Sequence, residues 1–151
     1  MARLKFGAFL APHHPVGEHP MLQFRRDLDF VEQIDGLGFD EFWCGEHHSS
    51  GWEMIASPEM FLAAAAEHTN RIKLATGVVQ ISARTPAATA MAFATLESLA
   101  GRGRVIAGLG LSGPQIVEGW YGQPWAKPIA RTRDYVAIMR QIFAREAPVS
   151  Y

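Results

Sequence analysis

The chain has 151 residues, of which 48% are hydrophobic and 19% are charged, and its formal net charge is -1. This composition is typical of a globular domain with one core and excludes a disordered tail. Basic residues are scattered and balanced by acids, so we expect no nucleic-acid partner. No apolar run approaches the ~20 residues of a membrane helix, and the single cysteine, Cys44, excludes an intramolecular disulfide. We therefore predict a cytoplasmic protein with no membrane segment.

Short apolar runs alternate with helical patterns along the chain. An apolar run over residues 4–10 predicts a first strand, and the prolines and glycine of 11–20 predict a loop. Apolar residues recur at three- and four-residue steps over 21–34, which predicts a one-sided helix. The run over 39–44 predicts a second, buried strand.

The later elements follow the same alternation. Ser57 before Pro58, and Thr85 before Pro86, are typical of helix starts with a hydroxyl cap. The long segment between the fourth strand and the last helix predicts a loop. We expect these elements at the following positions: a helix over 57–68, a strand over 72–79, a helix over 85–100, a strand over 105–109 and a helix over 135–143.

Strict alternation of strand and helix implies a parallel sheet with right-handed crossovers. Such a sheet is either open and doubly wound or closed as a (β/α)8 barrel, which needs about 250 residues. The four predicted units fill half of such a barrel. No linker or change in composition divides the chain, so we treat residues 1–151 as one structural unit.

The second predicted strand ends in Glu46, His47 and His48, at the edge of a parallel sheet where chemistry collects. Imidazole titrates near neutrality, so this run predicts an acid/base site, although histidines that cap backbone groups in a loop explain it equally well. Adjacent residues on a strand point to opposite faces, and no spacing matches a zinc site. We therefore predict no metal.

Glycines mark the third and fourth predicted strands. Gly77 interrupts the third strand, which is typical of a bulge or a close backbone approach. Gly108 and Gly110 resemble a phosphate-binding turn but lack the spacing of the dinucleotide and P-loop motifs. A tight turn under a close ligand or helix is the alternative.

Several segments, in this order, together resemble the bacterial luciferase-like superfamily of flavin- or deazaflavin-dependent oxidoreductases. The segments are 5–7, 38–40, Trp43 with 46–48, 57–58, 72–79 and 101–105. The resemblance covers essentially the whole chain. It implies an α/β fold of the (β/α)8 TIM-barrel type, of which residues 1–151 form the N-terminal half, with the cofactor ring at the C-terminal mouth.

The resemblance differs along the chain. Residues 1–79 are most similar to flavin monooxygenases of the limonene monooxygenase type, and residues 80–151 are more similar to reductases that use the deazaflavin coenzyme F-420. The resemblance therefore implies FMN or coenzyme F-420 as the cofactor. The implied reaction is monooxygenation with oxygen, or deazaflavin hydride transfer, on a small organic substrate.

Individual roles follow from the resemblance. His47 matches the catalytic histidine beside the reactive edge of the ring, and Glu46 matches an acid next to it. In a monooxygenase His47 would stabilise or protonate a flavin peroxide, and in a deazaflavin enzyme it would polarise the substrate. Gly77 and Val78 match the position of a non-prolyl cis peptide behind the ring. The strand end near the cofactor tail is matched by Gly110, Leu111 and Ser112.

Two groups of the family are absent from the loop after the fourth strand: a phosphate-holding arginine, and a carboxylate for which Glu118 is only a distant candidate. We expect a small-molecule substrate and a flavin reductase that supplies reduced flavin. A half barrel exposes two strand edges and an apolar face, so we also expect a homo-oligomer, such as a dimer paired edge to edge. The alternative is a catalytically silent half-barrel fragment, or a structural subunit that needs a partner chain.

Overall fold

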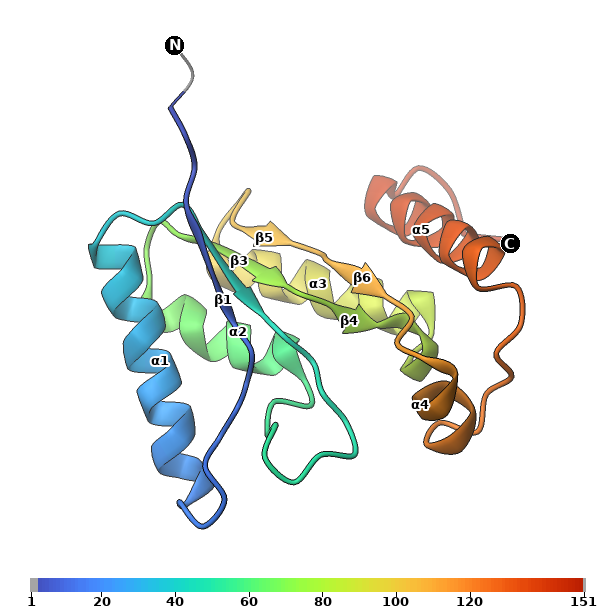
Figure 1. Ribbon diagram of the computed structural model, residues 1–151. Coiled ribbons are helices and arrows are strands. Elements are labelled where there is room, and N and C mark those ends of the chain that lie inside the picture. Colours follow the sequence, from blue (N-terminus) through green and yellow to red (C-terminus); the bar gives the residue numbers. More distant parts are fainter. Residues whose placement is uncertain (1–2, 151) are drawn as a thin grey trace.

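The computed structural model describes residues 3–150 and shows an α/β fold with a parallel sheet (Figure 1). The main sheet has four strands in the order β1-β2-β3-β5, and every neighbouring pair is parallel. These strands are β1 (Gly7–Leu10), β2 (Glu41–Cys44), β3 (Lys73–Thr76) and β5 (Val105–Ile106). A second, two-stranded parallel sheet pairs β4 (Val79–Gln80) with β6 (Leu109–Gly110).

Helices connect the strands. They are α1 (Pro20–Gly36), α2 (Pro58–His68), a 3-10 helix η1 (Ile81–Ala83), α3 (Pro86–Ala100), α4 (Pro114–Gly119) and α5 (Pro128–Ala144). The predicted alternation and the parallel sheet are confirmed. The third and fourth predicted strands are each divided in two. Helix α4 lies inside the segment predicted to be loop. The sequence did not predict this helix because six residues are too few to show a helical period.

The two predicted hydroxyl caps have different outcomes. The side chain of Thr85 accepts a hydrogen bond from the backbone N–H of Ala88 and caps α3, as predicted. Ser57 makes no side-chain cap, so that part of the prediction is wrong, although α2 does begin at Pro58. The backbone of Ser57 has φ -139° and ψ 81°, away from the extended ψ of a typical cap, and only its carbonyl starts the helix.

The core lies between the sheet and the helices. Phe42, Cys44 and Leu74 are fully buried on the face of the sheet that packs against the helices. The opposite face, here called the inner face, carries Phe9 and Trp43, and a Cβ at Gly77 would meet both of these rings. Phe9 is 59% exposed, because no helix covers this face. Helices α2 and α3 lie behind the sheet in Figure 1. Within residues 3–150 no helix is long and apolar enough to span a bilayer.

Two glycines allow β6 and the residues just before it to lie directly against the segment from β3 to β4. A Cβ at Gly108 would overlap the carbonyl oxygen of Thr76, and a Cβ at Gly110 would overlap a methyl group of Val78. The hydroxyl of Thr76 also donates to the carbonyl of Gly108 (2.8 Å) and accepts from its N–H (3.0 Å). The glycines are therefore explained by close packing of two chain segments.

We expect Gly108→Ala to destabilise the fold by about 3 kcal/mol or more, because the added methyl would meet backbone, which cannot rotate away as a side chain can. Denaturant unfolding measures the loss. Gly36→Ala is the matched control, since a Cβ at Gly36 meets nothing within 4 Å and the position is helical. A Gly108→Ala chain as stable as the wild type would contradict the packing described here.

Candidate functional site

The parallel register places the ends of β2 and β3 at the same level. Cys44 is paired with Thr76, and the N–H of Gly77 donates to the carbonyl of Cys44 (2.7 Å). Gly45 and Gly77 therefore lie side by side just beyond the C-terminal ends of the two strands. This is the edge at which ligands of parallel α/β proteins bind.

His47 lies on the inner face at this edge. A Cβ at Gly45 would be 3.2 Å from Nε2 of His47, so the imidazole covers the backbone of Gly45. The N–H of His47 donates to the carbonyl of Ile55 (3.2 Å), and its Nδ1 is 3.1 Å from Oε1 of Glu53. The side chain of His47 remains 38% exposed. The structure thus brings His47 and Gly77 to the same edge and the same face.

Aromatic rings flank Gly77. A Cβ at Gly77 would be 3.1 Å from Phe9 and 3.6 Å from Trp43. The indole N–H of Trp43 donates to Oε2 of Glu41 (3.0 Å), which orients the ring along the sheet. The peptide bond between Gly77 and Val78 is cis, as the resemblance implies. The edge therefore offers a ring-lined surface with no side chain at its centre.

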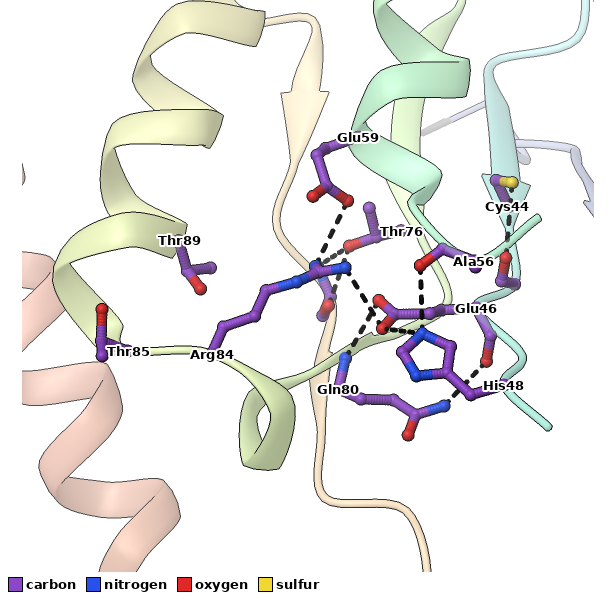
Figure 2. Close-up of polar contacts among 12 residues, drawn as sticks. Cys44, Glu46, His48, Ala56, Glu59, Thr76, Gln80, Arg84, Thr85 and Thr89 are labelled. Atoms are coloured by element: carbon purple, nitrogen blue, oxygen red, sulfur yellow. Dashed lines mark hydrogen bonds and ion pairs between the residues drawn. The ribbon is translucent and has the colours of Figure 1, made fainter. Parts of the chain in front are cut away.

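Glu46 points away from the inner face, and its side chain is fully buried. Its Oε2 accepts the backbone N–H of Gln80 (3.2 Å), and its Oε1 lies 3.3 Å from the guanidinium of Arg84. Arg84 also bonds Glu59 at the start of α2 (3.2 Å), so the guanidinium lies between two carboxylates, as Figure 2 shows. Burial raises the pKa of Glu46 to about 7, against the opposing effects of Arg84 and the Gln80 amide.

His48 lies on the same buried side as Glu46. Its Nε2 donates to the carbonyl of Ala56 (3.0 Å) and is 2.8 Å from Oε1 of Glu46 (Figure 2). Its Nδ1 is 2.6 Å from the hydroxyl oxygen of Tyr121, which itself donates to Oε1 of Gln80 (2.5 Å). Burial, reinforced by the Glu46 carboxylate, raises the pKa of Tyr121 to about 12. The phenol therefore stays protonated at neutral pH and can serve as a donor.

The other predicted cofactor contacts lie at the end of β6. Gly110 packs against Val78, as described above. The carbonyl of Leu111 accepts the hydroxyl of Ser82 (3.1 Å), and Ser112 is exposed with a left-handed φ of 65°. Glu118, the distant carboxylate candidate, is exposed on α4 and accepts the N–H of Trp125 (3.1 Å). Ser112 is exposed, and its side chain makes no hydrogen bond within the part of the chain that the structure describes.

Sequence reasoning missed four residues of the site: Glu53, Gln80, Arg84 and Tyr121. Arg84 lies directly before the predicted helix over 85–100, and Tyr121 lies in the long segment predicted to be loop, so no local signal marks either residue. An open cleft of about 450 Å³ lies beside His47 and His48, and Arg84 and Trp120 also line it. No group of three or more metal-binding side chains occurs in the part of the chain that the structure describes.

A comparison with protein families shows the family to which this chain belongs. Residues 4–151 match the model of the family described as luciferase-like monooxygenase. The chain belongs to the luciferase-like monooxygenase family. The candidate site at the C-terminal edge of β2 and β3 therefore lies in a luciferase-like chain.

Curated relatives of this luciferase-like chain include monooxygenases and an F420-dependent dehydrogenase. The chain is 41% identical to 4-hydroxyprotoasukamycin monooxygenase of Streptomyces nodosus over 99% of its own length and 40% of the relative. It is 51% identical to limonene 1,2-monooxygenase of Rhodococcus erythropolis over 72% of its length and 28% of the relative. It is 34% identical to an F420-dependent glucose-6-phosphate dehydrogenase of Intrasporangium calvum over 81% of its length and 39% of the relative.

Solved structures of similar fold identify the architecture. The FMN-bound oxygenating constituent of 3,6-diketocamphane monooxygenase from Pseudomonas putida superposes with a TM-score of 0.87 at 27% identity, over 97% of this chain and 41% of that one. The solved structures that this fold matches are luciferase-like (β/α)8 barrels, so the predicted barrel type is confirmed. The four strand–helix units of this chain form half of such a barrel. The chain spans 40% or less of the curated relatives described above. The predicted boundary between residues 79 and 80 stays a prediction.

We expect Glu46→Gln to change how stability depends on pH. The folded chain holds the proton of Glu46 with a pKa of about 7 against an ordinary 4.5, so it binds that proton more tightly than the unfolded chain does. The wild-type free energy of unfolding therefore falls as pH rises from about 4.5 to 7. Glutamine does not titrate. The free energy of unfolding of the variant, measured relative to that of the wild type, should therefore increase by up to about 3 kcal/mol as pH rises over this range.

Urea unfolding at a series of pH values measures this difference. Glu67→Gln makes the same chemical change at an exposed carboxylate of α2 and should leave the wild-type pH profile in place. Parallel pH profiles for Glu46→Gln and the wild type would show that burial does not raise the pKa of Glu46.

Proposed function

We propose that this chain binds the ring of a flavin or a deazaflavin on the inner face, at the C-terminal edge of β2 and β3, and takes part in the oxidation or reduction of a small organic substrate. The observation that carries the proposal is the convergence of His47, Gly77, Phe9 and Trp43 on one open face of the sheet. An FMN-bound solved structure and an F420-dependent relative, both similar to this chain, support the same conclusion.

The residues present fit a flat heterocycle. Phe9 and Trp43 supply apolar ring surface, and Gly77 leaves the backbone between them uncovered. Nε2 of His47 has no hydrogen-bond partner within residues 3–150 and lies beside this surface over Gly45. A polar group at the margin of a mainly apolar surface is the usual composition of a cofactor site.

The roles that we propose follow from these positions. A bound cofactor would supply hydride transfer or oxygen activation. His47 would give or take a proton at Nε2, next to the reacting atoms. Glu46 does not reach the inner face, so we assign it the positioning of His48 and Arg84 on the buried side. At the end of β6, Gly110, Leu111 and the exposed hydroxyl of Ser112 would contact the cofactor tail.

The proposal includes partners and a location. A flavin-dependent monooxygenase would need a flavin reductase to supply reduced flavin. A small molecule is the substrate class that an open, ring-lined edge can accept. Cys44 is a buried free thiol, and burial raises its pKa, which suits a reducing compartment such as the cytoplasm.

A titration with FMN and with coenzyme F-420 tests the proposed binding site. We expect saturable quenching of cofactor emission by the full chain, and the tighter ligand identifies the cofactor. Tryptophan emission should fall in parallel, because Trp43 lies on the inner face. Trp43→Phe should lose a larger share of this tryptophan signal than the matched Trp125→Phe, while both variants still bind.

Two outcomes would contradict the proposal. No saturable change with either cofactor would favour the catalytically silent half barrel, or a subunit that needs a partner chain. Equal signal losses in the two tryptophan variants would place the cofactor away from the inner face.

We also propose that the chain pairs with a second copy through its sheet edges. The carbonyls of Phe6 and Leu10 bond toward β2, so the alternate groups at Gly7 and Phe9 face the free edge of β1. A two-fold axis along the barrel would bring β1 of each copy beside the last strands of the other, and all pairs would stay parallel. The apolar inner faces would be covered at the same time.

Light scattering after size-exclusion chromatography tests this pairing. We expect a dimer for the wild type and a monomer for Phe9→Lys, because an inward-pointing charge opposes edge association. Met60→Lys, at a position that is 72% exposed on α2, should remain a dimer. A wild-type monomer that unfolds cooperatively would show that the chain needs no second copy.

A further inference from the structure

Glu53 lies between two histidines in the loop that follows β2. Its Oε1 is 3.1 Å from Nδ1 of His47 and 3.8 Å from Nε2 of His13. The Glu53 side chain is 17% exposed, whereas that of His13 is 66% exposed. The carboxylate is thus largely withdrawn from water, and a carboxylate can only accept hydrogen bonds. A nitrogen of His47 that faces it is stabilised when it carries a proton.

The backbone around Glu53 is fixed to the loop that follows β1. His13 and Glu53 form an isolated antiparallel bridge, and the N–H of His14 donates to the carbonyl of Trp52 (2.6 Å). The N–H of Glu53 donates to the hydroxyl of Ser50 (3.2 Å). Contacts between two loops from different βα units therefore fix the backbone at Glu53 without a contribution from the imidazole of His47.

His14 ties this pair of loops to α1. Its Nδ1 accepts the N–H of Met54 (3.3 Å), and its Nε2 is 2.7 Å from Oδ2 of Asp27. The side chain of His14 is only 4% exposed. Because Nδ1 is an acceptor here, the proton of neutral His14 is on Nε2. His14 therefore reports, through its own tautomer, whether the residue next to Glu53 is still docked.

We propose that Glu53 is a positioning residue that holds neutral His47 with its proton on Nδ1. Nε2, the nitrogen that lies over Gly45 on the inner face, is then the free nitrogen. The inference rests on the proposed function only in taking His47 as the reacting imidazole. It separates the two acids near His47: Glu46 precedes it in sequence but contacts His48, and Glu53 contacts the imidazole itself.

The tautomer has a direct chemical consequence. The neutral side chain of histidine in water favours the proton on Nε2, which would turn an N–H toward the inner face. The contact with Glu53 reverses this preference and presents a lone pair to a bound ligand instead. A histidine oriented through its other ring nitrogen by a carboxylate is also the arrangement that fixes ring position in metal and catalytic sites.

Long-range proton–nitrogen NMR of the 15N-labelled full chain at about pH 8, where a histidine of ordinary pKa is neutral, measures the tautomer. We expect wild-type His47 to be mainly protonated on Nδ1, and the ratio to invert toward Nε2 in Glu53→Ala. His47→Asn assigns the signals. His13→Ala removes the other histidine near Glu53 and should leave the His47 tautomer unchanged.

The signals of His14 verify that the loop is intact in each variant. If Glu53→Ala undocks the loop, Glu53→Gln, which is similar in size, replaces it and should lower the Nδ1-protonated population. Wild-type His47 with its proton on Nε2 would overturn the inference, as would an unchanged ratio in the variant whose His14 signals are native. The measurement needs no cofactor, so a failed cofactor titration would overturn the proposed function and leave this result standing.

Discussion

The parallel hydrogen bonding between β2 and β3 is the constraint on which the site depends. Because Cys44 pairs with Thr76 and the N–H of Gly77 bonds the carbonyl of Cys44, the two strands end at one level. Successive side chains of an extended chain point to opposite faces, so the residues beyond this level alternate between the inner face and the buried side. Any shift by one residue would exchange the inner and buried sides and move His47 away from Gly77.

This alternation gives two adjacent histidines opposite surroundings. His47 lies on the inner face with its side chain 38% exposed, whereas the side chain of His48 is 14% exposed and is held by Ala56 and Tyr121. The buried side contains the cluster of Glu46, Arg84 and Glu59, where desolvation is costly and each charge needs a partner. The open side keeps a single imidazole nitrogen free. The same short run of sequence therefore supplies both a rigid support and an accessible group.

The sequence was sufficient for the order of elements, the parallel sheet and the place of the Glu46–His48 run, because hydrophobic periods and strand ends are local signals. It was not sufficient for Glu53, Gln80, Arg84 and Tyr121. Tyr121 meets His48 across 73 residues, and no local pattern records such a contact. Helix α4 was too short to show a period, and the cap at Ser57 failed because a residue type does not determine its backbone angles.

The hydrogen bonds on the buried side also determine where a proton lies. The amide of Gln80 donates to the carbonyl of Glu46 (3.0 Å), so its oxygen faces Tyr121 and accepts the phenolic proton. The same Tyr121 oxygen lies 2.6 Å from Nδ1 of His48, and Nε2 of His48 donates to the carbonyl of Ala56. The carboxyl groups of Glu46 and Glu59 both face the guanidinium of Arg84. The raised pKa of Glu46 thus describes a proton that this buried carboxyl retains near neutral pH.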